Sequence, residues 1–182
     1  MRRVIAFDGH DACGKTTLGR AVAEALGAAF TSPYPPGSGA RLVRLWRQGR
    51  HSELAELAVD LLRGFEEAHA ENAVVVCDRH TVSAMALLPD AYHDRLKLPD
   101  VTVVCSADLP DVIAREAARG QALRPEELPE QRLLLERYRH LAERHRLYTA
   151  DSSTWSVSEL TEQVLLLLDA TSGRAAAGRQ IP

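Results

Sequence analysis

Cysteine, long apolar runs and surplus positive charge are scarce or absent in this chain of 182 residues. Its three cysteines, Cys13, Cys77 and Cys105, show no metal-ligand spacing and cannot all pair, which indicates a reducing cytoplasm. No apolar stretch reaches the roughly 18 residues of a membrane span, and the N-terminus lacks the features of a signal peptide. The net charge of −3 gives no electrostatic footprint for nucleic acid. We therefore expect a cytoplasmic protein without nucleic-acid or membrane partners.

Short apolar runs alternate with segments of helical periodicity, which predicts a single α/β domain over residues 1–171. The pattern is typical of a parallel sheet of five strands with helices on both faces. Residues 172–182 are small and polar, and we expect a flexible tail there. The expected strands are 3–8, 29–31, 74–77, 101–105 and 147–150, and the expected helices are 18–26, 40–50, 53–71, 108–119, 129–145 and 158–168.

The most specific signal is Gly-His-Asp-Ala-Cys-Gly-Lys-Thr-Thr, directly after the first apolar run and before a helical segment. The two glycines allow a tight turn, so that successive backbone N–H groups can face an anion at a helix N-terminus. The lysine supplies a charge for the β- and γ-phosphates, and the first threonine can ligate Mg²⁺. A glycine-rich turn that binds nothing is the alternative. The residues expected at the phosphates of a nucleotide are Gly9, His10, Asp11, Ala12, Cys13, Gly14, Lys15, Thr16 and Thr17.

Three side chains beside these motifs have both a chemical and a structural interpretation. The Cys13 thiol could be acidified and oxidisable at a helix N-terminus, or it could simply fill the loop. His10 is interpreted as loop structure and His80 as a candidate contact to the phosphoryl acceptor, because neither has a metal partner at ligand spacing.

A second cluster, Asp78-Arg79, follows the apolar run at 74–77. Asp78 can organise Mg²⁺ or its water shell, and Arg79 can grip a second phosphate through two hydrogen bonds. Ligands of parallel sheets gather beyond the carboxyl ends of the strands, which favours this function over a surface ion pair. Asp8 ends the first strand and could polarise a phosphate-bound water, hold an arginine or only cap the loop.

A third cluster contains Arg115, Arg119 and Arg124, on or just after a helix that is expected to end near Gly120. A short lid over about residues 119–129 could close these arginines over a transferring phosphoryl group and exclude water. A solvated basic helix face is the alternative.

Taken together, these segments resemble the thymidylate kinase family of nucleoside monophosphate kinases, from Ile5 to about Asp151. Residues 7–17 look like its phosphate loop, and 78–83 look like its Asp-Arg-Tyr-x-x-Ser motif. Residues 98–120 are similar to its Pro-Asp-strand-Asp-x-Pro pattern, which ends in an arginine.

The resemblance implies a three-layer P-loop NTPase fold, ATP and Mg²⁺ as cofactors, a nucleotide-like small-molecule substrate and a homodimer. In-line positioning and charge neutralisation would carry the reaction without a protein nucleophile. Arg79, assisted by Asp8, would hold the monophosphate of the acceptor. The residues implied for phosphoryl transfer are Lys15, Arg79, Arg119, Arg124 and Asp8, and those for the metal are Thr16 and Asp78.

The acceptor side departs from the family pattern. Leu87 and Leu88 stand where the family has tyrosine and glutamine, and Ser32 replaces an expected arginine. Phe65 could stack on a base or pack in the core. The donor side therefore looks intact, whereas the acceptor side looks remodelled and the acceptor can differ from thymidylate.

Three functions remain open at this point. The first is ATP-dependent phosphoryl transfer to a nucleoside monophosphate. The second is transfer to a hydroxyl of a nucleoside or small metabolite, for which Asp8 or Asp78 would serve as general base. The third is a nucleotide-binding switch without transfer, which the absence of a guanine-reading Asn-Lys-x-Asp motif makes less favourable.

Overall fold

A parallel sheet forms the centre of the computed structural model, which describes residues 3–177, with side chains as far as residue 171. The strands are β1 (Arg3–Gly9), β2 (Ala29–Thr31), β3 (Val74–Asp78), β4 (Val101–Ser106) and β5 (Tyr148–Asp151). They pair in the order β2-β3-β1-β4-β5, and every pairing is parallel. The predicted sheet of five parallel strands is thus confirmed.

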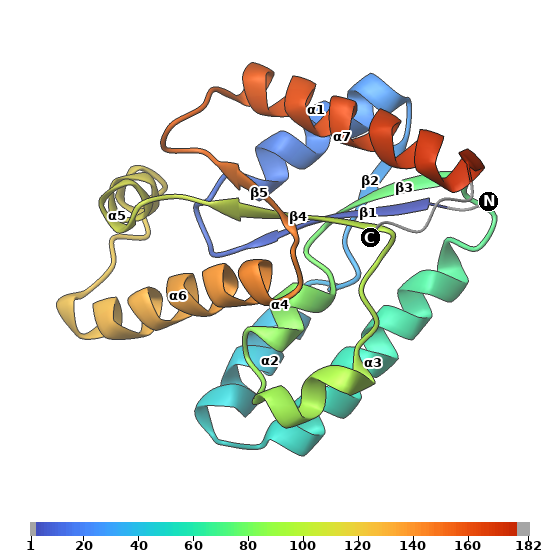
Figure 1. Ribbon diagram of the computed structural model, residues 1–182. Coiled ribbons are helices and arrows are strands. Elements are labelled where there is room, and N and C mark those ends of the chain that lie inside the picture. The colour runs from blue at the N-terminus through green and yellow to red at the C-terminus, as the bar shows by residue number, and fades with distance from the viewer. Residues whose placement is uncertain (1–2, 178–182) are drawn as a thin grey trace.

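Helices cover both faces of the sheet (Figure 1). They are α1 (Lys15–Leu26), α2 (Ser38–Arg47), α3 (His51–Ala68), α4 (Thr81–Met85), α5 (Leu109–Ala118), α6 (Leu128–Arg144) and α7 (Val157–Ala177), with 3-10 turns η1 (Asp90–Arg95) and η2 (Pro125–Glu127). In Figure 1, α1 and α7 lie over one face, whereas α3, α4 and α6 lie over the other, with α2 beside α3. This is the expected three-layer P-loop architecture. None of the helices within residues 3–177 is long and apolar enough to cross a bilayer.

Strand β1 shows why the sheet needs cover on both faces. Ile5 and Phe7 belong to the core beneath α1 and α7. The alternate residues Val4 and Ala6 pack on the opposite side with Phe65 of α3. Because both faces are buried, the sequence of the strand is a continuous apolar run, and this run is the pattern that predicted the strand.

The sequence patterns missed the short helices α4, η1 and η2 and placed the end of α7 too early. Helix α4 is buried along its whole length, so it has no amphipathic period to detect. Helix α7 continues to Ala177, so residues 172–177 of the expected tail are helical, and residues 178–182 lie outside the described part. Within the expected lid, residues 119–120 form a turn after α5 and residues 121–124 lack regular structure, and η2 and the start of α6 follow.

Gly9 ends β1 at a position where the chain has no room for a side chain. Its φ of 137° is one that L-residues rarely adopt, and a Cβ there would lie 2.2 Å from the Cys105 carbonyl oxygen. That oxygen belongs to β4, which pairs with β1 in the register Gly9–Cys105. The glycine therefore allows β1 to stay paired with β4 until the phosphate loop begins.

Replacement of Gly9 by alanine should destabilise the fold by about 3 kcal/mol or more, because both the positive φ and the clash with backbone must be relieved. Chemical denaturation of the purified variant measures this loss. Gly64→Ala is the matched control: it lies inside α3 with open space around it, and should stabilise the protein by about 0.5–1 kcal/mol. Equal stability of Gly9→Ala and the wild type would contradict the argument.

Candidate functional site

The phosphate loop runs from the end of β1 to the first turn of α1. Gly14 has a φ of 82° and Ala12 a φ of 59°, so the backbone reverses twice in a short distance. The Gly14 carbonyl accepts the first helical hydrogen bond from the Leu18 N–H at 3.0 Å. Such alternation of left- and right-handed residues turns successive N–H groups toward one point, which makes an anion-binding concavity.

Lys15 lies inside this loop, with only 5% of its surface exposed. Its Nζ donates to the His10 carbonyl at 2.6 Å and lies 3.9 Å from the Asp11 carboxylate. Burial, together with the nearby Arg79 guanidinium, lowers the pKa of the Lys15 ammonium. A poorly solvated cation held in an anion-binding loop is suited to a phosphate ligand, which would replace the lost hydration.

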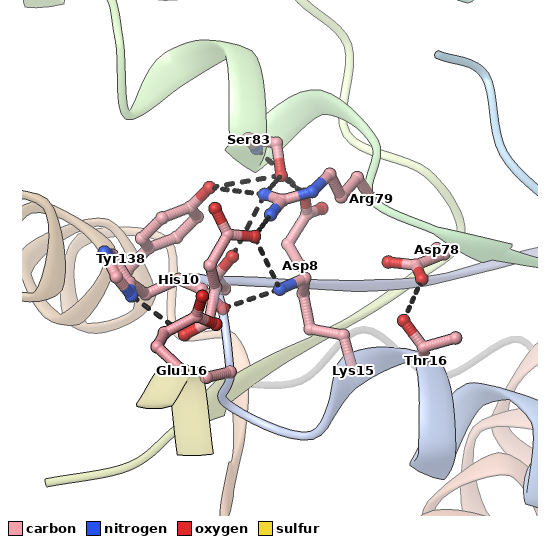
Figure 2. Close-up of polar contacts among 12 residues, drawn as sticks. Asp8, His10, Lys15, Thr16, Asp78, Arg79, Ser83, Glu116 and Tyr138 are labelled. Carbon is pink, nitrogen blue, oxygen red and sulfur yellow. Dashed lines mark hydrogen bonds and ion pairs between the residues drawn. The ribbon is translucent and has the colours of Figure 1, made fainter. Parts of the chain in front are cut away.

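Thr16 and Asp78 meet where the phosphate loop faces the end of β3. The Thr16 hydroxyl donates to Asp78 Oδ2, as Figure 2 shows. Within residues 3–177, no cluster of three or more histidine, cysteine or carboxylate side chains could hold a metal alone. A hydroxyl and a carboxylate oxygen still fit Mg²⁺, which usually takes one or two protein ligands and completes its shell with phosphates and water.

Arg79 reaches over the phosphate loop from the end of β3. Its Nη2 forms an ion pair with Asp11, and its Nη1 donates to the Gly9 carbonyl at 3.2 Å. Nη1 also lies 3.3 Å from the Tyr138 hydroxyl and 3.4 Å from Ser83 Oγ, as drawn in Figure 2. The structure thus brings Arg79 to the loop, as the sequence predicted, and fixes its orientation from several sides.

Asp8 is fully buried and anchors the chain that follows Arg79. Its Oδ1 accepts hydrogen bonds from the His80 N–H at 2.9 Å, the Ser83 N–H at 2.8 Å and the Ser83 hydroxyl at 2.6 Å. Its Oδ2 has no hydrogen-bond partner in the described part of the chain. Asp8 therefore holds the start of α4 against β1, in the manner of a helix cap.

Polar bonds join the segments that follow the strands. After β2, Ser32 Oγ donates to the Asp78 carbonyl at 2.9 Å and the Tyr34 hydroxyl to the His80 carbonyl at 2.7 Å. After β5, the Ser152 N–H donates to the Ser106 carbonyl at 3.0 Å. The carboxyl edge of the sheet is therefore one connected polar surface, as expected for parallel strands.

A cavity of about 770 Å³ opens on one side of the phosphate loop, between α2 and α6. Both polar and aliphatic side chains line it. The Tyr138 hydroxyl there donates to Ser83 Oγ at 3.2 Å, and burial raises the pKa of Tyr138 to about 12, so the phenol stays neutral. The lining includes the polar residues His10, Asp11, Tyr34, Arg44, Arg47, Gln48, Arg79, Ser83 and Tyr138, and the aliphatic residues Leu42, Val43, Leu87 and Leu134.

A second cavity, of about 340 Å³, opens on the other side of the same loop. Its lining includes the loop residues Ala12, Cys13, Gly14 and Thr17, and also Trp155 from the segment after β5. Trp155 is 46% exposed, so its indole offers an open face at this cavity. An aromatic face beside a phosphate loop is suited to stacking with a base.

The three arginines of the α5 region have different environments. Arg115 donates to the Ala12 carbonyl at 3.0 Å and to the Ser152 hydroxyl and carbonyl at 2.8 Å, so it joins the phosphate loop to the segment after β5. Arg119 lines the second cavity. Arg124 pairs with the glutamates of η2 and lies outside the lining of both cavities.

Sequence reasoning overlooked the roles of Tyr34 and Tyr138, whose contacts run to residues far along the chain. It marked Arg115 as one of three lid arginines, and did not predict that Arg115 joins the phosphate loop to Ser152. Tyr34 lies in a proline-rich loop, where only its place after β2 could have drawn attention. Phe65 packs in the core against His69 and His80, with ring centroids 4.6 and 5.8 Å apart, so core packing is its role.

Comparison of the sequence with known proteins finds curated relatives that match about two thirds of the chain. No protein-family model matches the chain. A probable thymidylate kinase of Methanococcus maripaludis is 31% identical over 139 residues, which cover 68% of this chain and 69% of that protein.

Solved structures share the fold at lower sequence identity. A thymidylate kinase of Candida albicans superposes with a TM-score of 0.66 and 12% identity, over 94% of this chain and 92% of that one. A deoxyadenosine kinase of M. mycoides with bound dATP has a TM-score of 0.62 and 15% identity, over 91% and 99% of the two chains. At such identities the likeness is one of fold.

The Cys13 thiol should be inert in the native protein at neutral pH. It is completely buried, and burial raises its pKa to about 11, so the reactive thiolate is scarce. Cys77 and Cys105 are buried as well. Ellman's reagent at pH 8 should therefore modify none of the cysteines until denaturant is added, and should then titrate all three. Rapid modification of one native thiol would instead indicate the acidified Cys13 that its helix N-terminus allows.

Proposed function

The chain belongs to the thymidylate kinase family and is a nucleotide kinase, and from this premise we propose that it transfers the γ-phosphoryl group of ATP to a nucleoside monophosphate. The products would be ADP and a nucleoside diphosphate. The bond from the γ-phosphorus to the β–γ bridging oxygen would break, and an oxygen of the acceptor phosphate would form the new bond. Thymidylate is the first acceptor to test, because the relative from Methanococcus maripaludis is a probable thymidylate kinase.

The observation that carries this proposal is the pair of cavities on either side of one phosphate loop. His10 and Asp11 line the larger cavity, and Ala12 and Gly14 line the smaller. Two substrates bound in these cavities would direct their phosphates at the loop from opposite sides. Transfer between two phosphates needs such in-line positioning more than it needs a protein nucleophile.

We assign ATP to the smaller cavity, with its phosphates on the loop amides, Lys15, Thr16 and Thr17. Mg²⁺ would be held by Thr16 and Asp78, and when bound it neutralises charge on the phosphates. Arg119 would lie near the donor because it lines this cavity. A role for Arg124 in phosphoryl transfer stays a prediction, and it requires the segment from 119 to 127 to move toward this cavity.

The larger cavity suits the acceptor, with Arg79 at its monophosphate. Asp8 would act by holding the segment that carries Arg79 and Ser83. The Arg79 guanidinium, which several partners hold in this cavity, favours an anionic acceptor over an uncharged nucleoside. His80 is buried beneath this segment, and its contact with the acceptor stays a prediction.

Phosphorylation of a hydroxyl is the second candidate, because the deoxyadenosine kinase of M. mycoides shares the fold. That reaction needs a general base, for which Asp8 and Asp78 are the candidates. Oδ1 of Asp8 accepts hydrogen bonds from His80 and Ser83, and Oδ2 of Asp78 accepts one from Thr16, whereas Oδ2 of Asp8 has no partner in the described part of the chain. Assays of ADP release with ATP, Mg²⁺ and matched pairs of nucleosides and monophosphates separate the two candidates. Turnover of nucleosides alone would reject the proposed function.

A homodimer and a cytoplasmic location stay predictions, the first of which light scattering would check.

Lys15→Met should abolish most of the activity without unfolding the protein. Loss of a charge aimed at the transferring phosphoryl group should lower kcat by about 10²–10³-fold. Stability should change by no more than about 1 kcal/mol, because one hydrogen bond is lost while a costly buried charge is removed. Steady-state kinetics and thermal unfolding measure the two effects.

Lys97→Met is the matched control, since Lys97 is the only other lysine and is exposed outside both cavities. It should keep wild-type kinetics. Full activity of Lys15→Met would contradict the assignment of the phosphate loop as the donor site.

A further inference from the structure

A carboxylate in the last turns of α5 is buried on the face of that helix that packs into the core. Glu116 is 7% exposed, and Val112, one turn earlier, is completely buried and belongs to a core cluster. Residues four apart on a helix share one face, so the helical period favours an apolar residue at position 116. A charge there loses hydration, and an acid near a helix C-terminus also opposes the helix dipole. Stability alone therefore does not account for Glu116.

The partner of this carboxylate is Arg119, which follows the last residue of α5. Arg119 Nη1 donates to Glu116 Oε1 at 3.2 Å. The Arg119 side chain is 56% exposed and that of Glu116 is 9% exposed. An ion pair that is half open to water adds little to stability, so it does not offset the burial of the acid. The hydrogen bond takes up one of the five N–H groups of a guanidinium that also lines the smaller cavity.

The backbone around Arg119 is fixed by the way in which α5 ends. Gly120 has a φ of 76°, and its N–H donates to the Ala117 carbonyl at 3.0 Å. The Gln121 N–H donates to the Glu116 carbonyl at 2.9 Å. These two bonds around a left-handed glycine form a Schellman motif, which closes a helix C-terminus. Both the backbone and the guanidinium of Arg119 are therefore held by α5.

The two arginines predicted for the lid thus differ in how they are held. Arg124 follows a segment without regular structure and pairs with the glutamates of η2. Arg119 precedes that segment and lines the cavity assigned to ATP. A cation that is already in place needs no reorganisation when charge develops on a transferring phosphoryl group. Arg119 meets this condition through Glu116.

We propose that Glu116 is a positioning residue, which holds the Arg119 guanidinium at the donor cavity before ATP binds. This inference rests on the proposed function through the assignment of ATP to the smaller cavity. A long side chain loses rotamer freedom when it is ordered, and the bond to Glu116 orders Arg119 in the free protein. The carboxylate makes the fold less stable, and in return the site is preorganised for the donor.

The test is a double-mutant cycle of Glu116→Met and Arg119→Met, in which kcat and both KM values are measured with ATP, Mg²⁺ and dTMP. Methionine fills the buried position without a charge, so Glu116→Met should be at least as stable as the wild type in thermal unfolding. We expect kcat to fall by about five- to tenfold with the KM of the acceptor unchanged, as for a side chain that is no longer ordered. In the Arg119→Met background the same change should alter kcat by less than about twofold, because no guanidinium remains to be positioned.

Two further variants complete the experiment. Glu116→Gln should recover part of the kcat lost in Glu116→Met, because its amide oxygen can still accept the hydrogen bond from Arg119. Asp60→Asn is the matched control. Asp60 also stands three residues before its arginine partner, Arg63, but this pair lies on α3 and outside the lining of both cavities. Asp60→Asn should keep wild-type kinetics.

A wild-type kcat in Glu116→Met would overturn the inference, and so would an equal fall with and without Arg119, since that would show an acid that only supports the fold. Full activity of Arg119→Met would overturn it as well. Failure of the proposed acceptor is a separate result. A wild type that turns over nucleosides alone rejects the monophosphate as acceptor, but the cycle is then measured with the nucleoside, because ATP is the donor in both reactions.

Discussion

The buried carboxylate of Asp8 is the contact on which the geometry of the site depends. It lies next to the last residue of β1, and it accepts hydrogen bonds from the backbone of the segment that follows β3. Pairing of β1 with β3 already brings the two strand ends together, and the Arg79 N–H donates to the Phe7 carbonyl at 2.9 Å. Asp8 then fixes what comes after Arg79, so the guanidinium can face the phosphate loop. A shift at this contact would move the Arg79 guanidinium away from the phosphate loop.

The burial of Lys15 destabilises the fold but places a cation in the phosphate loop. An ammonium that is poorly exposed loses hydration, and the His10 carbonyl and the Asp11 carboxylate compensate it only in part. The loop also holds Ala12 at a positive φ, where glycine would be less strained. Both features make sense where a polyphosphate supplies the missing interactions. The backbone of the loop is thereby preorganised for an anion.

The sequence allowed prediction of the sheet and of the phosphate loop because their signals are local. Gly9, Gly14 and Lys15 specify the loop within a few positions, and the apolar runs specify buried strands. The positions of Tyr138 and Arg115 depend on how α5 and α6 pack, which no local pattern encodes. Helix α4 was missed for the same reason, since complete burial removes the periodicity by which a helix is found.

The acceptor side escaped prediction for a deeper physical reason. The sequence left two roles open for Phe65 on α3, stacking on a base and packing in the core; no residue of α3 lines the cavity, and Phe65 packs in the core beneath the sheet. The outer lining comes from α2 instead, including Arg44 and Arg47. A fold fixes where the phosphates meet, because strand ends and the loop are parts of the sheet itself. The helices that border the larger cavity can change their residues without disturbing that arrangement, so phosphate binding is easier to predict from a sequence than the second molecule that such a cavity accepts.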